Sequence, residues 1–272
     1  MESIKEYVAL RKRDLHSIIL EAKHKHKFNI LLAIIQVGDN PASNVYVKGK
    51  IKDCNEVGVS AKLYKLSERI DEEKILSLIN KLNKNSKVDG IIVQLPLPKH
   101  ISEENIKMAI LPQKDVDGFH PLSKFIPCTP KGIIDYLEDQ RFNFEGKHAV
   151  VIGRSNIVGK PMYKELLKRN CTVSQLHSKT SPATFKKLVE SADLIVCATG
   201  HRDILTKKFK YKKSAIIMDV GINKDENGKL HGDCEPELNV SYQSPVPGGV
   251  GLLTRLALVE NVVNASLTKY SK

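Results

Sequence analysis

The sequence has no tryptophan and only five cysteines. The number of cysteines is odd, and no two of them have the CxxC spacing of redox or zinc motifs. Two histidines, His24 and His26, lie in a lysine-rich stretch without further metal ligands nearby. We therefore expect reduced, mostly structural thiols and no metal site. The cysteines are Cys54, Cys128, Cys171, Cys197 and Cys234.

Long apolar runs are also lacking, since none reaches the roughly 18 residues that a membrane-spanning helix requires. The N-terminal stretch MESIKEYVALRKRDLHSIIL carries charges throughout, whereas a secretory signal has an uncharged apolar core. These absences predict a cytoplasmic protein without a membrane partner.

The chain is strongly basic, with 43 lysine and arginine residues, 31 acidic residues and a formal net charge of +12. One interpretation is a nucleic-acid partner. The lysines are nevertheless spread along the whole chain, without an arginine-rich tract or an aromatic RNA-binding motif. The composition favours a lysine-biased, solvated surface, and we expect no nucleic-acid partner. A further hypothesis is that the positive field attracts a small anionic substrate.

Hydrophobic periodicity divides the chain into two series of alternating strands and helices. The first series has helices at 3–27, 41–57 and 71–85, and strands at 28–38, 60–66 and 89–98. The second has helices at 129–140, 156–170, 181–191 and 253–267, and strands at 147–153, 172–178, 193–200 and 215–221. Such alternation is typical of parallel α/β sheets.

The segment VVIGRSNIVGKP, residues 150–161, ends a predicted strand and opens a helix. Its glycines and serine have the spacing GxSxxxG, at Gly153, Ser155 and Gly159, instead of GxGxxG. A glycine at such a turn lets the backbone approach a pyrophosphate, and the helix N-terminus supplies free N–H groups. The bare pattern also fits an ordinary tight turn, but its place between strand and helix favours dinucleotide binding.

The end of the next predicted strand indicates which dinucleotide is bound. An NAD enzyme usually has an acidic residue there, which accepts a hydrogen bond from the ribose 2′-hydroxyl. This chain has His177-Ser178-Lys179-Thr180 instead. Ser178 can donate a hydrogen bond to a 2′-phosphate and Arg154 can pair with it, so the sequence predicts NADP as the cofactor.

The expected fold class is therefore α/β, with two domains and a cleft between them. Residues 1–121 and the C-terminal helix, 253–272, are expected to form the first domain. Residues 122–252 are expected to form the second, a Rossmann-type dinucleotide-binding domain.

Three lysines lie close together in the segment SNVYVKGKIKDC, residues 43–54. At about 100° per residue they do not share one helix face. Lys48 and Lys52 lie on one flank, whereas Lys50 lies on the other flank with Tyr46 and Ser43. The apolar stripe between the flanks consists of Val47, Ile51 and Cys54.

Lys48 and Lys52 fit a solvated helix face, but Lys50 admits two interpretations. A desolvated lysine beside Tyr46 can lose its proton and act as a base, or Lys50 can be solvated like its neighbours. Ser43 can likewise support Lys50 or only cap the helix. The pair Tyr46 and Lys50 also matches the YxxxK of short-chain dehydrogenases, but there the pair follows the glycine loop, and here it precedes Gly153.

Taken together, these segments resemble the bifunctional methylenetetrahydrofolate dehydrogenase/cyclohydrolase family, the FolD type. The matching motifs occur in the family's order and cover nearly the whole chain. They are SNVYVKGK (43–50), VDGIIVQLPLP (88–98), PQKDVDGFHP (112–121), PCTPKGI (127–133), VVIGRSNIVGKPM (150–162), HSKT (177–180), DVGIN (219–223) and PVPGGVG (245–251).

The resemblance implies two linked reactions. NADP+ takes a hydride from 5,10-methylenetetrahydrofolate, which gives 5,10-methenyltetrahydrofolate, and water then opens the methenyl ring to 10-formyltetrahydrofolate. The resemblance also implies tetrahydrofolate derivatives as partners and a homodimer. One alternative is a dehydrogenase with weak or lost cyclohydrolase activity, and another is a basic binding protein that reuses the fold without catalysis.

The resemblance assigns roles to individual residues. Lys50 would be the catalytic lysine of the water step, tuned by Gln94, and Tyr46 would lie against the folate rings. Asp117 would accept hydrogen bonds from the pterin edge. The other substrate-binding residues would be Leu95, Pro96, Pro247, Gly248 and Gly249, and the NADP-binding residues would be Gly153, Arg154, Ser155, Ser178, Thr199, Gly200, Gly221 and Ile222.

Two of these roles have simpler alternatives, and two segments depart from the family pattern. Asp117 can be a turn residue, since Asp-Gly is a common turn pair, and Gln94 can be a strand-end residue bonded only to backbone.

The family usually has Pro-Met-Thr after PGGVG, where this chain has Leu252-Leu253-Thr254. The segment Leu122–Ile126 is also shorter than the corresponding family loop, so both departures bear on the shape of the folate pocket.

The cofactor prediction is tested by Ser178→Asp. The change removes a hydrogen-bond donor and places a like charge beside the 2′-phosphate, so NADP+ binding should weaken by about 2–3 kcal/mol. Use of NAD+ should suffer less, and steady-state kinetics with both dinucleotides measure the difference. A wild-type protein that already prefers NAD+ would contradict the interpretation of Ser178 and Arg154.

Overall fold

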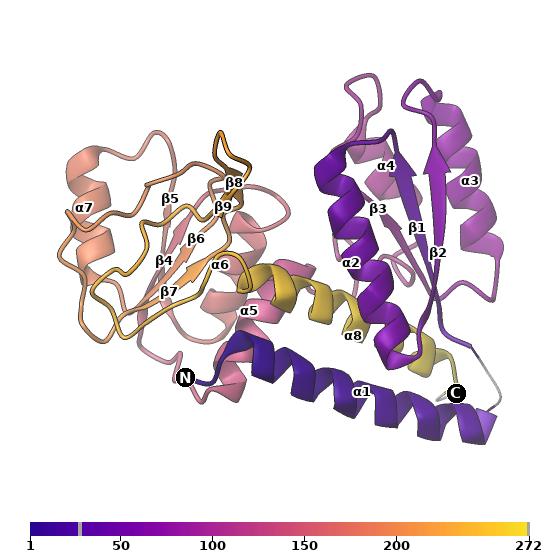
Figure 1. The fold of residues 1–272 in the computed structure, drawn as a ribbon, viewed down its shortest axis with the longest axis horizontal. Coiled ribbons are helices and arrows are strands. Elements are labelled where there is room, and N and C mark those ends of the chain that lie inside the picture. Colours follow the sequence, from indigo (N-terminus) through magenta and orange to yellow (C-terminus); the bar gives the residue numbers. More distant parts are fainter. Residues whose placement is uncertain (27–28, 271–272) are drawn as a thin grey trace. The chain divides into compact units, whose positions relative to one another are not determined.

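The computed structural model describes residues 1–26 and 29–270 (Figure 1). The chain forms two compact units. Unit 1 comprises Met1–Val8 and Thr129–Thr254, and unit 2 comprises Ala9–Cys128 and Arg255–Lys272. Each unit contains a parallel sheet with helices packed beside it, which confirms the predicted two-domain α/β class. The exact domain boundaries expected from the sequence stay a prediction.

The sheet of unit 2 has three parallel strands in the order β2-β1-β3. Strand β1, Leu31–Val37, is central and almost completely buried, which explains its continuous apolar sequence. Strand β3, Gly90–Val93, is buried throughout, whereas the edge strand β2, Ser60–Leu66, is partly exposed. The helices that follow these strands are α2, Pro41–Val57, α3, Glu72–Lys84, and α4, Glu103–Ala109.

The main sheet of unit 1 has five parallel strands in the order β10-β7-β6-β4-β5. Its strands are β4, His148–Ile152, β5, Thr172–Leu176, β6, Leu194–Cys197, β7, Ile216–Asp219, and β10, Tyr242–Gln243. Strands β8, Asn223–Lys224, and β9, Leu230–His231, form a separate antiparallel pair. The helices are α5, Cys128–Asp139, which begins in unit 2, α6, Gly159–Lys168, and α7, Pro182–Ser191.

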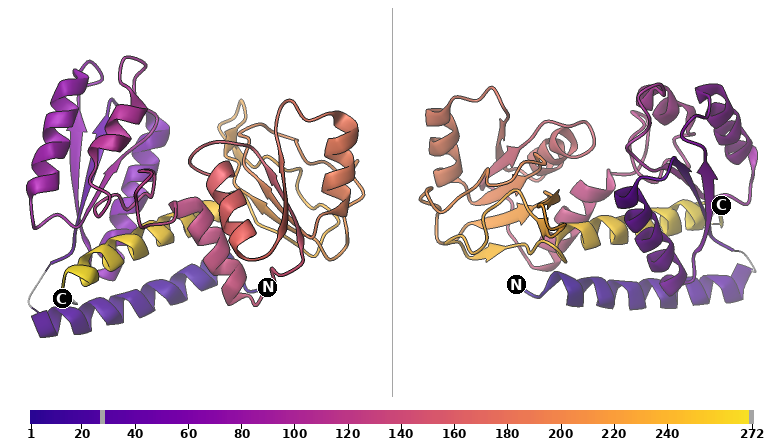
Figure 2. Two further views of the ribbon diagram at one scale, coloured as in Figure 1. Left: turned by 180° about the vertical axis from the view of Figure 1, so that it is seen from behind. Right: turned by 45° about the horizontal axis from the view of Figure 1, so that its top comes forward.

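Two long helices, α1, Ile4–His26, and α8, Val250–Tyr270, begin in unit 1 and continue in unit 2. Within unit 2 they lie side by side (Figure 2), and Arg11 Nη2 donates to Glu260 Oε1 at 3.0 Å. Residues Val250–Lys269 are long and apolar enough to cross a membrane, with a mean hydropathy of 1.2. However, 67% of this window is buried within the structure, as expected for a core helix.

The structure differs from the sequence prediction at several element boundaries. Helix α4 and strands β8, β9 and β10 were not predicted, because segments of two to seven residues are too short to show a hydrophobic period. The strand predicted at 89–98 ends at Val93, before two prolines that cannot donate to a sheet. Helix α8 begins at Val250, three residues before the predicted start at 253. The predicted boundaries at 27, 28 and 272 lie outside the described residues.

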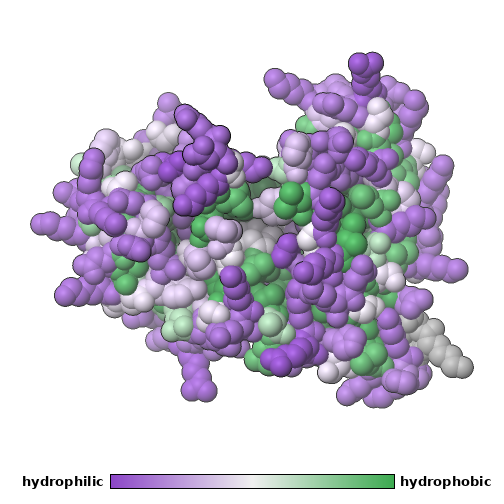
Figure 3. Space-filling model, viewed as in Figure 1, coloured by the Kyte–Doolittle hydropathy of each residue, from purple (hydrophilic) through white to green (hydrophobic). Residues whose placement is uncertain are grey.

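Hydrophilic side chains cover most of the visible surface of each unit in Figure 3, with smaller apolar areas between them. The strongly exposed large apolar side chains include Val45 and Leu122, which are 68% and 74% exposed. Isolated exposed apolar residues of this kind are normal on a protein surface.

A buried carboxylate, Asp53, ties three helices together in unit 2. It is 3% exposed and lies on α2. Its Oδ1 is 2.5 Å from Lys12 Nζ of α1, and its Oδ2 is 2.8 Å from Arg255 Nε of α8. Two cations thus face one desolvated carboxylate. Removing one partner of such a buried ion pair lowers the free energy of unfolding strongly, because the remaining charge is left buried without compensation.

We expect Asp53→Asn to lower the free energy of unfolding by about 2–4 kcal/mol, because Arg255 would lose its counter-charge and Lys12 would keep only the more exposed Glu56. Urea denaturation measures the change. The matched control is Glu56→Gln, which removes a second, more exposed partner of Lys12 and should cost less than about 1 kcal/mol. Equal losses in both variants would contradict the central role of Asp53.

Candidate functional site

Helix α2 carries the lysine-rich segment and begins directly after the carboxyl end of β1. Its N-terminus is capped by Asn40, whose Oδ1 accepts from Ala42 N at 2.9 Å and from Ser43 N at 3.1 Å. The possibility that Ser43 caps the helix is therefore wrong, since Ser43 is a buried residue within the first turn. Asn40 thus fixes the start of the helix, and with it the directions of the side chains that follow.

The two flanks of α2 differ as the helical period predicts. Lys48 and Lys52 are exposed, whereas Lys50 and Tyr46 are half-buried. Between the flanks, Val47 and Cys54 are buried and Ile51 is half-buried. Lys50 is therefore the lysine of this segment with the distinct environment.

Lys50 contacts the glutamine at the end of a neighbouring strand. Lys50 Nζ donates to Gln94 Oε1 at 3.1 Å, and Gln94 Nε2 donates to Leu95 O at 2.7 Å. The backbone N–H of Gln94 donates to Ile35 O of β1 at 2.8 Å. Because β1 and β3 are parallel neighbours, Gln94 and helix α2 meet at the same edge of the sheet. The alternative that Gln94 bonds only to backbone is wrong.

Asp117 lies in the same unit and is 9% exposed. Burial raises the pKa of its carboxyl group, and the positive charges of Lys50 and Lys107 oppose this rise. Cys128 Sγ is 3.9 Å from Asp117 Oδ1. The preceding segment is anchored by Asn261 of α8, whose Nδ2 donates to Val116 O at 2.9 Å. Asp117 is therefore a fixed, desolvated carboxyl group within electrostatic reach of Lys50.

A small cavity connects several of these residues. Leu95, Lys107, Asp117 and Phe119 contribute to its lining, and Lys107 Nζ lies 5.6 Å from the centre of the Phe119 ring. Pro96, the neighbour of Leu95, lines a second hollow with residues that follow β1. The predicted residues Tyr46, Lys50, Gln94, Leu95, Pro96 and Asp117 thus all belong to unit 2.

Sequence reasoning missed one charged residue of this half, Arg255. Burial raises the pKa of Tyr46, and the charge of Arg255 opposes the rise. The guanidinium group of Arg255 also packs against the backbone of Gly49, since a Cβ atom added to Gly49 would lie 2.1 Å from Arg255 Nη1. The glycine next to Lys50 therefore leaves room for a guanidinium group. No sequence pattern relates two positions so far apart in the chain.

The three remaining substrate-binding candidates lie in unit 1. Pro247, Gly248 and Gly249 form the turn that precedes α8, and Gly248 has a φ of 92°, in the left-handed region. Leu252 and Leu253 belong to the first turn of α8. The roles expected for these residues in a folate pocket stay predictions.

The predicted phosphate loop follows β4 in unit 1. Gly153 has a φ of 118°, and a Cβ atom there would lie 2.2 Å from Ala198 O, so this turn requires glycine. Ser155 Oγ accepts from Val158 N at 3.2 Å and from Gly159 N at 3.3 Å. These bonds hold residues 155–158 in a turn, so α6 begins at Gly159 and not at the predicted residue 156.

Arg154 and Ser178 follow two neighbouring strands. Gly153 N donates to Leu176 O at 2.9 Å, which joins the carboxyl ends of β4 and β5. Arg154, Ser155 and Ser178 are all exposed. An exposed guanidinium and two hydroxyl groups beside a helix N-terminus form a donor set that suits the phosphates of NADP.

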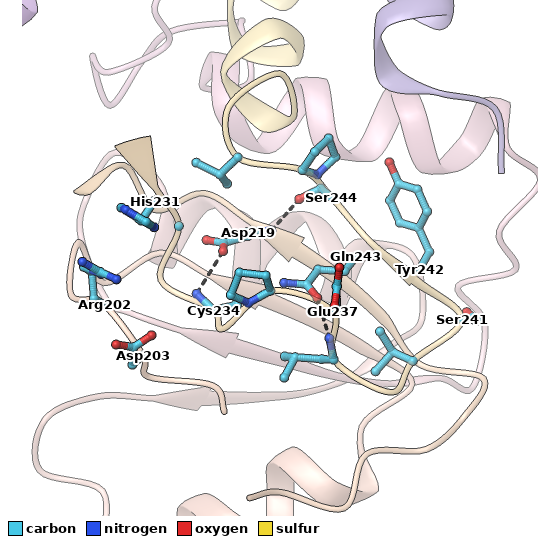
Figure 4. A pocket seen from close by; sticks show the side chains of 16 residues that line it. Arg202, Asp203, Asp219, His231, Cys234, Glu237, Ser241, Tyr242, Gln243 and Ser244 are labelled. Atoms are coloured by element: carbon cyan, nitrogen blue, oxygen red, sulfur yellow. Dashed lines mark hydrogen bonds between the residues drawn. The ribbon is translucent and has the colours of Figure 1, made fainter. Parts of the chain in front are cut away.

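The other four cofactor candidates follow β6 and β7, which are also neighbours. Thr199 and Gly200 come after β6, and Gly221 and Ile222 come after β7. Both turns contact a buried carboxylate, Asp233, that the sequence analysis did not select. Its neighbourhood includes a pocket that is lined in part by Asp219 and Cys234 (Figure 4).

Comparisons with known proteins also find two domains in this chain. The model of the tetrahydrofolate dehydrogenase/cyclohydrolase catalytic domain matches residues 3–117, and that of the corresponding NAD(P)-binding domain matches residues 127–270. The "Bifunctional protein FolD" of Streptococcus uberis is 43% identical over 261 residues, which are 91% of each chain.

Solved structures show the same likeness. The bifunctional enzyme FolD from Campylobacter jejuni is 42% identical, with a TM-score of 0.93 over 97% of both chains. The FolD of Trypanosoma brucei, complexed with NADP cofactor and inhibitor, is 25% identical, with a TM-score of 0.94 over 100% of this chain and 98% of that one. With both family domains matched in order, this chain belongs to the tetrahydrofolate dehydrogenase/cyclohydrolase family.

Proposed function

We propose that the protein oxidises 5,10-methylenetetrahydrofolate with NADP+ and hydrolyses the resulting 5,10-methenyltetrahydrofolate to 10-formyltetrahydrofolate. The contact of Lys50 Nζ with Gln94 Oε1, at 3.1 Å, carries this proposal. Lys50 is half-buried, and its positive charge acts on the desolvated carboxyl group of Asp117. Both residues lie in the segment that matches the catalytic-domain model. The bifunctional names of the relatives support the pair of reactions over a dehydrogenase alone.

In the hydrolysis, Lys50 acts on the attacking water. Gln94 Oε1 accepts a hydrogen bond from Lys50 Nζ and so fixes the amine. As a general base, the amine of Lys50 takes one proton from water as the oxygen bonds to the methenyl carbon. The carbon–N5 bond then breaks as the new hydroxyl group loses its proton and becomes the formyl C=O, N5 gains a proton, and the proton held by Lys50 is released. The net reaction converts the methenyl cation and water into 10-formyltetrahydrofolate and one proton.

Asp117 and Tyr46 bind the folate ring system. A buried carboxylate presents two acceptor oxygens, which suit the two N–H donors at the pterin edge. The half-buried ring of Tyr46 offers an apolar face for stacking. We assign Leu95 and Pro96 to apolar contacts with the folate, and the turn Pro247–Gly249 to folate binding as well.

For the oxidation, NADP+ would supply the hydride acceptor when bound. The chain would contribute binding and orientation: Arg154 and Ser178 would hold the 2′-phosphate, and Gly153, Ser155 and the N-terminus of α6 would receive the pyrophosphate. Thr199, Gly200, Gly221 and Ile222 complete the cofactor site.

Within this proposal the enzyme is a cytoplasmic homodimer that acts on tetrahydrofolate derivatives, and residues 1–121 with 253–272 form its folate domain. Light scattering coupled to gel filtration tests the dimer. Absorbance assays with 5,10-methylenetetrahydrofolate and NADP+ test the reactions. Conversion through to 10-formyltetrahydrofolate supports the proposal, accumulation of the methenyl compound indicates a dehydrogenase alone, and no turnover contradicts both.

The role of Lys50 is tested by Lys50→Met. Loss of general acid–base help should slow hydrolysis of the methenyl compound by about 10²–10⁴-fold. Oxidation should fall less, because hydride transfer depends more on the alignment of two carbon centres than on a base. The exposed Lys48 provides the control, and Lys48→Met should leave both rates nearly unchanged. A Lys50→Met variant that hydrolyses the methenyl compound at the wild-type rate would exclude Lys50 from the mechanism. Equal losses of hydrolysis rate in Lys50→Met and Lys48→Met would show that the position of a lysine on the helix does not determine its role.

The role of Asp117 is tested with the variant Asp117→Asn, in which the stability of the fold and the KM for the substrate are measured separately. Because burial raises the folded-state pKa above its unfolded value, this carboxyl group contributes less to stability as the pH rises through the folded pKa. The neutral variant should therefore gain stability relative to wild type as the pH rises from about 4, where the unfolded carboxyl group ionises, through the folded pKa. Its KM for 5,10-methylenetetrahydrofolate should nevertheless rise about tenfold or more, because an acceptor is lost.

Urea denaturation at several pH values and steady-state kinetics measure the two effects of Asp117→Asn. An unchanged KM would contradict the folate-binding role of this carboxylate. A relative stability that falls with rising pH would contradict the effect of burial.

A further inference from the structure

Asp233 has a completely buried side chain in unit 1 and is 0% exposed. Its Oδ2 atom accepts three hydrogen bonds from the turn that follows β6. The donors are Thr199 N at 2.6 Å, Thr199 Oγ1 at 2.9 Å and Gly200 N at 3.0 Å. One carboxylate oxygen therefore fixes the backbone of Thr199 and Gly200.

The second oxygen of Asp233 meets the segment that follows β7. Asn223 Nδ2 donates to Asp233 Oδ1 at 3.0 Å. Gly221 packs directly against the same atom, since a Cβ atom added to Gly221 would lie 2.0 Å from Asp233 Oδ1. The carboxylate thus links the turns after two neighbouring strands, and Gly221 is required for this close approach.

A second buried aspartate holds Asp233 in place. Asp219 Oδ1 accepts from Asp233 N at 2.9 Å and from Gly221 N at 3.0 Å, and Asp219 Oδ2 accepts from Cys234 N at 2.9 Å. Figure 4 shows the hydrogen bonds that join Asp219 to Cys234 and to Ser244. Asp219 N donates to Ser244 Oγ at 2.8 Å. The position of Asp233 is therefore set by the carboxyl end of β7.

The charge of Asp233 also restricts what the turn after β6 can bind. The N–H groups of Thr199 and Gly200 already donate to a carboxylate, so they are not available to a phosphate. A phosphate beside this turn would also be repelled by the buried negative charge. By contrast, the turn between β4 and α6 presents a helix N-terminus and the exposed Arg154, which favour phosphate.

We propose that Asp233 is a positioning residue for the nicotinamide half of NADP. It orders the turns at Thr199–Gly200 and Gly221–Ile222 to receive the uncharged part of the dinucleotide, while the phosphates bind at Gly153–Gly159 and Ser178. This inference rests on the proposed function, because it takes these four residues to be part of the cofactor site. Ordering in advance strengthens binding, since the bound state then fixes less of the chain.

The test compares NADP+ with adenosine 2′,5′-bisphosphate, which carries the adenosine and the 2′-phosphate but no nicotinamide. Isothermal titration calorimetry measures the affinity of both ligands for wild type and for Asp233→Asn. The amide –NH2 would face N–H donors in place of an acceptor, so the Kd for NADP+ should rise about tenfold or more. The Kd for adenosine 2′,5′-bisphosphate should change by less than about twofold.

Hydrolysis of 5,10-methenyltetrahydrofolate without NADP+ provides an internal control, because its proposed residues Lys50 and Gln94 lie in unit 2. This rate should be unchanged in Asp233→Asn. The matched control variant is Glu226→Gln, which makes the same charge change at an exposed position and should leave both affinities unchanged. If Asp233→Asn does not fold, Asn223→Ala removes only the donor to Oδ1 and should raise the Kd for NADP+ selectively, by a smaller factor.

Three results would overturn the inference. An unchanged Kd for NADP+ in Asp233→Asn, or in Asn223→Ala where only that variant folds, would show that the carboxylate does not order the site. An equal loss of affinity for both ligands would show that it supports the whole unit and not the nicotinamide half. A wild-type protein that binds adenosine 2′,5′-bisphosphate but gains no affinity from the rest of NADP+ would contradict the role of the two turns. Failure of wild type to bind either ligand would instead remove the proposed function, and the inference with it.

Discussion

Parallel pairing of neighbouring strands is the constraint on which the proposed folate site and the proposed cofactor site both depend. In a parallel sheet all carboxyl ends meet at one edge, so the segments that follow adjacent strands come together even when they are far apart in sequence. In unit 2 this places Gln94, after β3, within 3.1 Å of Lys50 on the helix that follows β1. In unit 1 it places Arg154 and Ser178 after adjacent strands. Strand pairing therefore brings the segments that carry the proposed site residues together, whatever side chains these segments bear.

Three buried aspartates show how the surroundings of a carboxylate decide what it can do. Asp53 faces the cations of Lys12 and Arg255 and so stabilises a helix junction. Asp233 faces N–H and O–H donors and fixes two turns. Asp117 has neither a hydrogen-bonded cation nor a set of backbone donors within the described residues, and burial raises its pKa. A desolvated carboxyl group of this kind favours an incoming ligand that brings its own donors, which is the physical reason to place the pterin there.

The sequence alone predicts those features that depend on local periodicity. The separation of Lys50 from Lys48 and Lys52 follows from the helical repeat, and the strand–turn–helix at Gly153 follows from the glycine and the apolar run before it. Asp233 and Arg255 could not be found in this way. Their importance comes from contacts with Thr199 and with Asp53, which are distant in the chain. Two-residue strands such as β10 also cannot be predicted from the sequence, because β10 is defined only by its pairing with β7.

The division of residues between the two units has a chemical consequence for the two reactions. Under the proposed function, Lys50, Gln94 and Asp117 belong to unit 2, whereas the NADP-binding residues belong to unit 1. Hydrolysis needs water, the methenyl compound and the base, and its proposed catalytic groups all come from unit 2. Oxidation needs the folate and the dinucleotide together, so it requires ordered turns in unit 1 as well. If Asp233 orders Thr199 and Gly200 for the cofactor as proposed, its loss should slow oxidation alone, and the chain should retain hydrolysis when its dinucleotide-binding residues are perturbed.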